Sequence, residues 1–243
     1  ARVVKHGNRA ASSKSGAADL LEALGIKIDL TGSEVEQTVH KIGIGFCFAP
    51  IFHSSMKHAA SARKELGTPT IFNILGPLAN PAKAVACAIG VARAELLPLI
   101  SQVLLEQGKE GFVFRGDDGL DEVSISTTTQ VIQIHDGKLT PSEFNPSDLG
   151  ITSSSISDLA GGDAKYNAQM TMKIFAGHKG PMRDAVTLNA AFAIAAFKAD
   201  FDLPLQTQIA NAYVLANKAI DSGAALSVVK KWAELTNEIV SAR

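Results

Sequence analysis

Short apolar runs alternate with amphipathic stretches through the first half of the chain, a pattern that predicts alternating strands and helices. The predicted strands cover residues 3–4, 46–49 and 85–91, and the predicted helices cover residues 16–24, 33–41, 53–66 and 95–106. Ser33 is the predicted N-cap of the second helix, and Glu36 stands at the third position of its capping box. A loop rich in glycine and proline at residues 73–81 separates the third helix from the next strand.

The pattern changes in the middle of the chain. Short strands are predicted at residues 111–115, 123–126, 130–135 and 138–140, and the Asp136-Gly137 dipeptide is a strong hairpin signal. Helical periodicity then dominates at residues 163–176, 182–198, 204–222 and 224–240. This order predicts an α/β fold with a mixed, mostly parallel sheet flanked by helices.

The composition is that of a globular protein. Of the 243 residues, 46% are hydrophobic and 19% are charged, and the formal net charge is −1. A near-neutral chain without a basic block argues against nucleic-acid binding. Cys47 and Cys87 lie in apolar runs, so both are expected to be buried thiols and not disulfide partners. The apolar run at residues 190–197 is far too short to span a bilayer.

A dense polar cluster at residues 5–16 joins a strand end to a helix start. It holds the cations Lys5, Arg9 and Lys14 among small residues and two glycines. Backbone N–H groups at such a helix start, together with cationic side chains, form a place for anions. A solvated turn is the alternative interpretation. The cluster lacks the glycine spacing of a P-loop or a dinucleotide-binding turn.

A second cluster is acidic and covers residues 117–122, Asp-Asp-Gly-Leu-Asp-Glu. An acidic loop between strands can hold Mg²⁺ through one or two carboxylates, with water and phosphate oxygens as the remaining ligands. A solvated hairpin loop is again the alternative. The two clusters support each other, because Mg²⁺ and cationic loops both bind phosphates.

Three further features carry weaker signals. His53, Lys57 and Arg63 share a face of the helix predicted at residues 53–66, for which a solvated helix face is the alternative. Arg183 is expected to form a structural ion pair near the start of an apolar helix. Asp163, after two glycines, is expected to cap the following helix.

Several longer motifs occur in order along the chain and together resemble the anthranilate phosphoribosyltransferase family of tryptophan biosynthesis. They are Lys-His-Gly-Asn-Arg at 5–9, Ser-Ser-Lys-Ser-Gly at 12–16, Phe-Ala-Pro at 48–50, Met-Lys-His at 56–58, Arg-Lys-Glu-Leu-Gly at 63–67, Thr-Ile-Phe-Asn-Ile-Leu-Gly-Pro-Leu at 70–78, Asp-Gly-Leu-Asp-Glu at 118–122 and Ala-Ile-Asp-Ser-Gly-Ala-Ala at 219–225. The resemblance covers essentially the whole chain.

The resemblance implies a fold of the nucleoside phosphorylase and phosphoribosyltransferase class, and transfer of the phosphoribosyl group of phosphoribosyl pyrophosphate (PRPP) to the amine of anthranilate. Residues 1–243 would form the catalytic α/β domain. The family's small helical N-terminal domain and its Gly-Thr-Gly-Gly-Asp loop would be missing or incomplete in this sequence, which starts at Ala1 inside a predicted strand. The family is further expected to be cytoplasmic and, as a full-length protein, homodimeric.

The resemblance also implies roles for individual residues. The predicted PRPP-binding residues are Lys5, His6, Gly7, Asn8, Arg9, Ser12 and Ser13. Asn8, His53 and Arg63 would bind anthranilate, with the Arg63 guanidinium on its carboxylate. Asp121 and Glu122 would bind Mg²⁺. No dedicated catalytic nucleophile or base is predicted.

Two alternative functions stay open at the level of sequence. One is a catalytically inactive fragment or binding module that keeps part of the substrate site. The other is an enzyme similar to the pyrimidine nucleoside phosphorylases, although the Lys-His-Gly-Asn-Arg motif and Arg63 favour an aromatic acid over a nucleobase.

Overall fold

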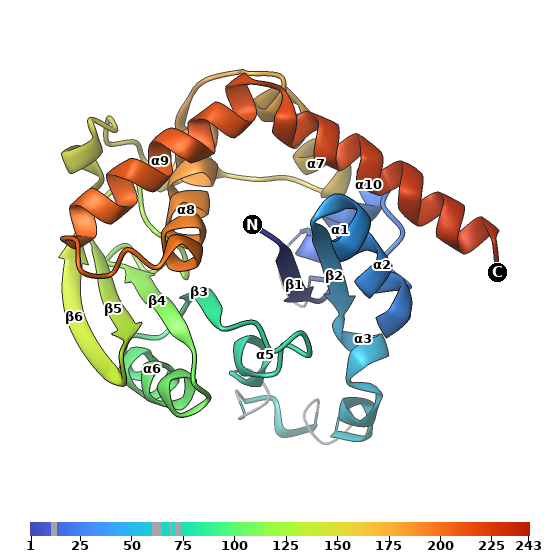
Figure 1. The fold of residues 1–243 in the computed structure, drawn as a ribbon, viewed down its shortest axis with the longest axis horizontal. Coiled ribbons are helices and arrows are strands. Elements are labelled where there is room, and N and C mark those ends of the chain that lie inside the picture. Colours follow the sequence, from blue (N-terminus) through green and yellow to red (C-terminus); the bar gives the residue numbers. More distant parts are fainter. Residues whose placement is uncertain (11–13, 60–64, 69, 71–73) are drawn as a thin grey trace. The chain divides into compact units, whose positions relative to one another are not determined.

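A computed structural model describes residues 1–10, 14–59, 65–68, 70 and 74–243 (Figure 1). The chain divides into two compact units, which are described separately. The first unit comprises Ala1–Lys83, Gly161–Met172 and Ala225–Arg243. The second comprises Ala84–Ala160 and Lys173–Ala224.

The second unit is built on a four-stranded sheet. Its strands, in spatial order, are β3 (Ala86–Gly90), β4 (Glu110–Gly116), β5 (Thr129–His135) and β6 (Lys138–Phe144). β3 and β4 are parallel, whereas β4–β5 and β5–β6 are antiparallel. The predicted turn between β5 and β6 is confirmed, because Asp136 and Gly137 both have positive φ, 48° and 70°, as a two-residue type I′ turn requires.

Helices pack on both faces of this sheet. α6 (Leu97–Glu106) contacts β4, β5 and β6, and α8 (Pro181–Lys198) contacts β3 and β4. α9 (Leu205–Asp221) packs along α8. Because side chains alternate along a strand, Phe112 and Phe114 of β4 share one face. Both belong to the core cluster that contains the α8 residues.

Phe192 of α8 lies at the centre of this core. Its ring contacts the rings of Phe112, Phe114 and Phe144 in edge-on arrangements, with centroid distances of 5.5, 5.4 and 5.4 Å. Phe192 and two of these partners are fully buried. Edge-to-face contacts of this kind stabilise the core beyond the burial of apolar area alone.

The first unit holds a parallel pair of strands, β1 (Val3–Gly7) and β2 (Ile44–Phe48). α1 (Ala17–Ala23) and α2 (Gly32–Ile42) connect the two strands. Most of α10 (Ala224–Ser241) belongs to this unit, and its Trp232 is buried against Ala18, Ile26 and Phe46. Further helical elements in the described parts of the chain are α3 (Ala49–Phe52), η1 (Ser54–Ala59), α5 (Leu75–Leu78), η3 (Ala94–Leu96), η4 (Pro146–Leu149), η5 (Ile156–Leu159) and α7 (Ala164–Phe175).

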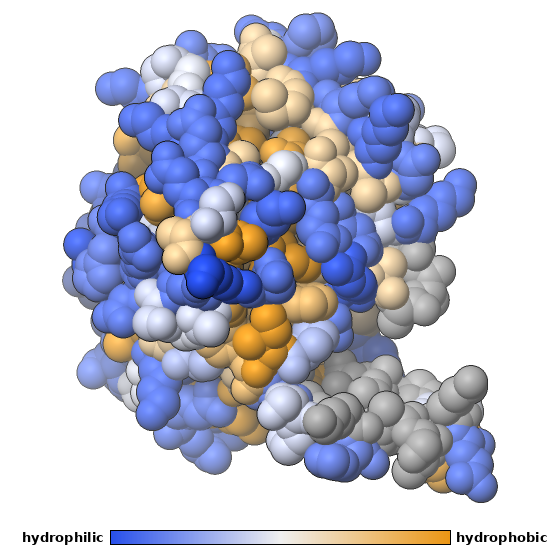
Figure 2. Space-filling model, turned by 90° about the vertical axis from the view of Figure 1, so that its right-hand side faces the viewer, coloured by the Kyte–Doolittle hydropathy of each residue, from blue (hydrophilic) through white to orange (hydrophobic). Residues whose placement is uncertain are grey.

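The mixed α/β class predicted from the sequence is confirmed. Among the described residues, two strand pairings are parallel and two are antiparallel, and helices flank the larger sheet. The four helices predicted after residue 160 all occur, with ends that differ from the prediction by at most one residue. One face of the molecule is mainly hydrophilic, with hydrophobic residues gathered near its middle (Figure 2).

Two predicted helix details are wrong. The N-cap of α2 is Thr31 and its box partner is Glu34, whose carboxylate accepts hydrogen bonds from the backbone N–H and the hydroxyl of Thr31 at 2.7 and 2.8 Å. The helix predicted at 53–66 is not continuous: α3 starts earlier, with Pro50 in its first turn, and His53 ends it with non-helical φ −129° and ψ 52°. η1 follows, and residues 60–64 lie outside the described residues.

The strand predicted at residues 123–126 is also wrong. This segment is buried, as an apolar run predicts, but it forms no strand. Side chains, instead of a neighbouring strand, bind its backbone groups.

Other local predictions are confirmed. Asp163 caps α7, since its Oδ1 accepts a hydrogen bond from Tyr166 N at 2.8 Å. Arg183, which is buried, forms an ion pair with the exposed Asp221 of α9 at 2.7 Å. Cys47 is buried and Cys87 half-buried, both are free thiols, and burial raises the pKa of each to about 11. None of the described helices is both long and apolar enough to cross a membrane.

Replacement of Phe192 by alanine should lower the free energy of unfolding by about 3–5 kcal/mol, because it leaves a cavity among three aromatic rings. Phe197→Ala is the matched control on the same helix, with a side chain that is 55% exposed, and should change stability by less than about 0.5 kcal/mol. Urea denaturation measures both. Equal losses in the two variants would contradict the central position of Phe192.

Candidate functional site

The anion-binding cluster predicted from the sequence begins at the carboxyl end of β1. β2 runs parallel to β1, so the segment after β2, which forms α3 and His53, starts from the same edge of the strand pair. Ligands of α/β proteins bind outside the carboxyl ends of parallel strands. The chain direction alone therefore brings residues 5–10 and His53 to the place where such folds bind their substrates.

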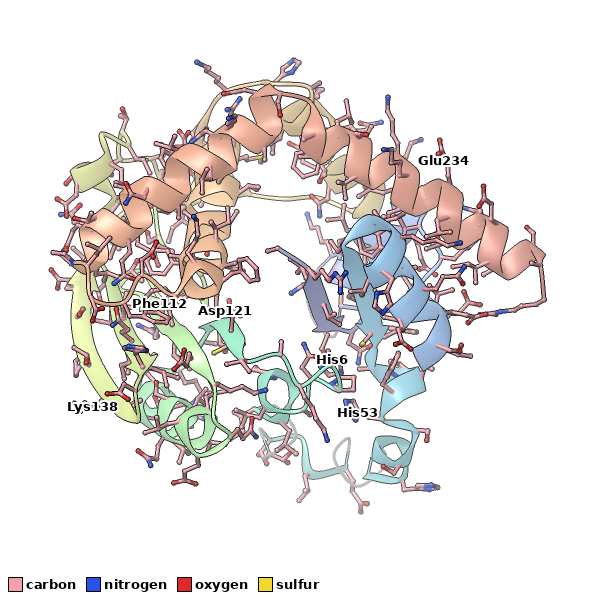
Figure 3. The ribbon with its side chains drawn as sticks, in the orientation of Figure 1. His6, His53, Phe112, Asp121, Lys138 and Glu234 are labelled. Atoms are coloured by element: carbon pink, nitrogen blue, oxygen red, sulfur yellow. The ribbon has the colours of Figure 1, made fainter. Side chains whose placement is uncertain are left out.

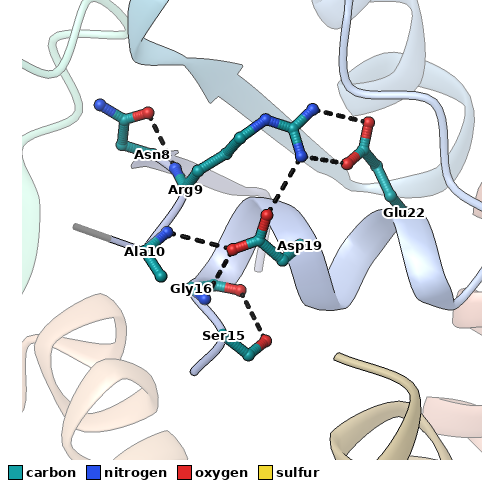
Figure 4. Close-up of polar contacts among 7 residues, drawn as sticks. All are labelled: Asn8, Arg9, Ala10, Ser15, Gly16, Asp19 and Glu22. Atoms are coloured by element: carbon teal, nitrogen blue, oxygen red, sulfur yellow. Dashed lines mark hydrogen bonds and ion pairs between the residues drawn. The ribbon is translucent and has the colours of Figure 1, made fainter. Parts of the chain in front are cut away.

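The carboxylate of Asp19 joins the two ends of this loop, Ala10 and Gly16 (Figure 4). Its Oδ2 accepts hydrogen bonds from Ala10 N at 3.1 Å and from Gly16 N at 2.8 Å, so the two ends of the loop are tied to the first turn of α1. These two backbone donors are the main reason why the pKa of Asp19 is lowered. A Cβ at Gly16 would lie 2.4 Å from Ala10 N, so this close approach requires glycine.

Arg9 is turned toward α1. Its guanidinium donates to both carboxylate oxygens of Glu22 and, at 3.1 Å, to Asp19 Oδ1, and it lies 5.5 Å above the centroid of the Phe48 ring. These hydrogen bonds raise the pKa of Arg9, and the bonds to Glu22 have the largest effect. In this arrangement two carboxylates already balance the charge of Arg9, and Lys5 is a second exposed cation on β1.

His6 and His53 meet edge to face (Figure 3). Their ring centroids are 4.8 Å apart and their planes are inclined by 88°. His6 Nδ1 lies 3.1 Å from the carbonyl oxygen of Gly76, just inside α5. The Nε2 atoms of both rings are buried, and within the described part of the chain neither has a hydrogen-bond partner. Buried polar atoms rarely lack a hydrogen-bond partner, so these two ring nitrogens mark the place as a candidate ligand site.

The contact with Gly76 defines the proton position on His6. A carbonyl oxygen only accepts hydrogen bonds, so Nδ1 of His6 carries the proton and Nε2 of the neutral ring carries a lone pair. Burial is the largest cause that lowers the pKa of His6, and the nearby His53 and Lys5 lower it further, against the opposing effect of the Gly76 carbonyl. His6 therefore presents a hydrogen-bond acceptor to a ligand.

Two other predicted residues of this cluster, Gly7 and Asn8, lie within the described part of the chain. Asn8 is exposed, and its Oδ1 accepts a hydrogen bond from Arg9 N at 2.8 Å. A Cβ at Gly7 would lie 2.8 Å from the Phe46 ring, so glycine lets the strand end pack on β2. Ser12, Ser13 and Arg63 lie outside the described residues.

The acidic loop follows β4 in the second unit. Asp117 accepts hydrogen bonds from Thr128 and Gln130, and Asp118 Oδ2 accepts one from Ser124 Oγ at 2.6 Å. These two carboxylates thus hold the loop together. Asp121 and Glu122 are exposed. The hydrogen bonds therefore give Asp117 and Asp118 a structural role in the loop, a distinction that the sequence alone did not make.

The exposed pair fits Mg²⁺ better than a metal that needs a full protein cage. Among the described residues, no group of three or more histidine, cysteine or acidic side chains is placed to hold a metal ion. Mg²⁺ prefers hard oxygen ligands and is commonly bound by one or two carboxylates, with water and phosphate oxygens completing the octahedron. Asp121 and Glu122 offer this donor set.

Comparison with protein families gives one match over most of the chain. Residues 1–226 match the family described as "Glycosyl transferase family, a/b domain". Two curated relatives, the anthranilate phosphoribosyltransferases of Rhodococcus jostii (strain RHA1) and Rhodococcus opacus (strain B4), are each 50% identical over 242 residues. Each alignment covers 100% of this chain and 67% of the relative, so the chain spans about two thirds of their length.

Solved structures show the same similarity in three dimensions. Anthranilate phosphoribosyltransferase from Thermus thermophilus is 36% identical with a TM-score of 0.87, over 97% of this chain and 69% of that chain. The enzyme from Saccharomyces cerevisiae in complex with PRPP and Mg is 29% identical with a TM-score of 0.88, over 98% of this chain and 65% of that chain.

The lowered pKa of His6 has a consequence for stability. The unfolded chain binds a proton at about pH 6.5, and the folded chain does so only at lower pH. The contribution of His6 to the free energy of unfolding is therefore fully present above about pH 6.5 and is lost as the pH falls through the folded-state pKa. The free energy of unfolding should decrease more steeply below about pH 6.5 in the wild type than in His6→Gln.

Denaturation at a series of pH values measures this difference, and ¹⁵N NMR of the ring checks that Nδ1 is the protonated nitrogen. Parallel pH profiles for the wild type and His6→Gln would contradict the assignment.

Proposed function

Because the chain belongs to the anthranilate phosphoribosyltransferase family, we propose that it transfers the phosphoribosyl group of PRPP to the amine of anthranilate, releasing pyrophosphate. The observation that carries this proposal is the family match over residues 1–226 together with 50% identity to enzymes of that name. The paired histidines at the carboxyl end of β1 support it independently, because they leave two polar atoms for a ligand.

The reaction needs positioning more than it needs a strong base. The aryl amine of anthranilate is neutral at pH 7, so it attacks C1 of the ribose without prior deprotonation, while the bond from C1 to pyrophosphate breaks and the sugar gains oxocarbenium character. The nitrogen then loses one proton to give the neutral product. Catalysis then rests on holding the two reactants in line and on stabilising the leaving group. The proposal therefore requires no activated protein nucleophile.

The loop after β1 is the proposed PRPP site. Lys5 supplies positive charge, and Gly7, Asn8, Ser12 and Ser13 bring backbone and side-chain donors close to the phosphates and the ribose. Asp19 supports the site by fixing both ends of the loop. Arg9 is held by Glu22 and Asp19 and would contribute mainly by keeping the loop on α1.

Anthranilate is proposed to bind between His6, His53, Asn8 and Arg63. The neutral Nε2 of His6 accepts an N–H of the amine, which orients the nitrogen lone pair toward the sugar. Arg63 binds the carboxylate, because the guanidinium fork matches a carboxylate in geometry and charge. An aromatic acid uses both groups, whereas a nucleobase has no carboxylate for Arg63, and this favours a transferase over a nucleoside phosphorylase.

Asp121 and Glu122 are proposed to hold Mg²⁺. When bound, Mg²⁺ neutralises the charge that develops on the leaving pyrophosphate. The part of this chain is to place two carboxylates on a loop that Asp117 and Asp118 brace from within. The homodimer and the cytoplasmic location are likewise proposals that rest on the family resemblance.

A direct assay tests the proposed function. The 243-residue chain is mixed with anthranilate, PRPP and Mg²⁺, and the loss of anthranilate fluorescence is followed. Turnover that requires all three components supports the proposal. Binding of PRPP or anthranilate without turnover, measured by calorimetry, would instead favour the binding-module alternative for this chain.

The replacement Asp121→Asn should raise the Mg²⁺ concentration needed for half-maximal activity by at least about tenfold, the smallest loss typical of groups around a metal. Asp117→Asn is the matched control in the same loop, because the Asp117 carboxylate already binds Thr128 and Gln130. It should lower stability and leave the Mg²⁺ dependence unchanged. An equal shift in both variants would remove Asp121 from the metal site.

A further inference from the structure

The segment that follows the acidic loop is buried without being part of a sheet. Val123 and Ile125 are 2% and 0% exposed and belong to the core cluster around α8, and Ser124 is 1% exposed. Buried backbone N–H and C=O groups require hydrogen-bond partners, and here no neighbouring strand supplies them. The groups that form hydrogen bonds with this segment in place of a strand therefore fix its position, and with it the position of Asp121 and Glu122 directly before it.

Asn189 of α8 takes the place of the missing strand at Val123. Its Oδ1 accepts a hydrogen bond from Val123 N at 2.8 Å, and its Nδ2 donates to Val123 O at 3.0 Å. Nδ2 also donates to Ala185 O at 3.0 Å, which fixes the amide against its own helix. The side-chain amide thus pairs with both backbone groups of one residue, as a peptide of an adjacent strand would.

Two further contacts fix the surroundings of the acidic pair. Ser124 N donates to Thr129 Oγ1 at 3.0 Å, and Ser124 Oγ donates to Asp118 at 2.6 Å. On the other side, the backbone of Asp121 lies directly against β3, where a Cβ at Gly90 would be only 1.8 Å from Asp121 O. The backbone of Asp121 is therefore in close contact with Gly90 of β3. Glu122 is followed directly by Val123, whose backbone is hydrogen-bonded to Asn189.

We propose that Asn189 is a positioning residue for the Asp121–Glu122 pair, and that its double hydrogen bond to Val123 sets the geometry with which these carboxylates meet Mg²⁺ and the pyrophosphate of PRPP. The inference rests on the proposed function, which assigns the two carboxylates to the metal. Nothing in the family motifs of this sequence assigns a role to Asn189, which stands in an apolar helix far along the chain.

The physical reason is the strict geometry of Mg²⁺. This ion demands near-ideal octahedral coordination at short distances, so a carboxylate whose backbone drifts loses much of its value as a ligand. Residues that orient the ligands typically matter almost as much as the ligands. Glu122 is bonded directly to Val123, and no side-chain rotation lies between the held peptide and the Glu122 backbone.

The test compares Asn189→Ala with Asn217→Ala. Asn217 is a matched control because it is also a partly buried asparagine in the same helical pair, where it accepts a hydrogen bond from Arg183 at 2.9 Å and donates to Tyr213 O at 3.1 Å. Both replacements remove buried hydrogen bonds and should lower the melting temperature. Only Asn189→Ala should affect the metal.

Two readouts other than turnover are used. Hydrogen exchange by NMR measures the Val123 amide, which should be protected in the wild type and in Asn217→Ala but exchange faster in Asn189→Ala. Calorimetric titration with PRPP at a series of Mg²⁺ concentrations should show the Mg²⁺ requirement for PRPP binding raised by about tenfold in Asn189→Ala only. The KM for anthranilate should not change.

If Asn189→Ala does not fold, Asn189→Asp replaces it, since aspartate keeps the acceptor for Val123 N and loses the donors to Val123 O and Ala185 O. An unchanged Mg²⁺ requirement together with faster Val123 exchange would overturn the proposal and leave Asn189 a purely structural role. PRPP binding in the wild type that is independent of Mg²⁺ would overturn the proposed metal site itself, and this result is visible without any variant.

Discussion

Buried or crowded backbone groups outside regular strands need hydrogen-bond partners, and side chains from nearby elements provide them at each candidate segment. The Asp19 carboxylate accepts hydrogen bonds from the backbone N–H groups of Ala10 and Gly16, at the two ends of the loop after β1. Asn189 pairs with the N–H and carbonyl of Val123 beside the acidic pair. Side chains of α1 and α8 therefore form hydrogen bonds with the segments that carry the predicted substrate and metal residues.

Charge is distributed so that some ionisable groups hold the protein together and others remain exposed to ligands. Glu22 and Asp19 bind the guanidinium of Arg9, while Lys5 beside it is exposed. In the acidic loop, Asp118 accepts a hydrogen bond from Ser124, while Asp121 is exposed. A loop that binds a highly charged substrate must be rigid before the substrate arrives, because ordering it on binding would cost affinity.

Much of the fold could be predicted from the sequence because its signals are local. The turn at Asp136-Gly137 follows from two residues that tolerate positive φ, and the long helices after residue 160 follow from apolar periodicity. The failures have a common physical cause. An apolar run such as residues 123–126 is equally compatible with a strand and with a buried segment that has no strand partner. What distinguishes the two is the hydrogen bond between Val123 and Asn189, which are 66 positions apart.

The sequence by itself determined the family, the mixed α/β class and the residue types that suit a phosphorylated sugar, an aromatic acid and Mg²⁺, because these depend on motifs of neighbouring residues. Only the tertiary structure decided which residues of each motif form contacts within the protein that stabilise the site. It turned Arg9 toward Glu22, brought His53 to the edge of His6 and placed the Gly76 carbonyl on Nδ1 of His6. These contacts join residues that are 13 to 70 positions apart, and their partners are determined by packing, which no local pattern records.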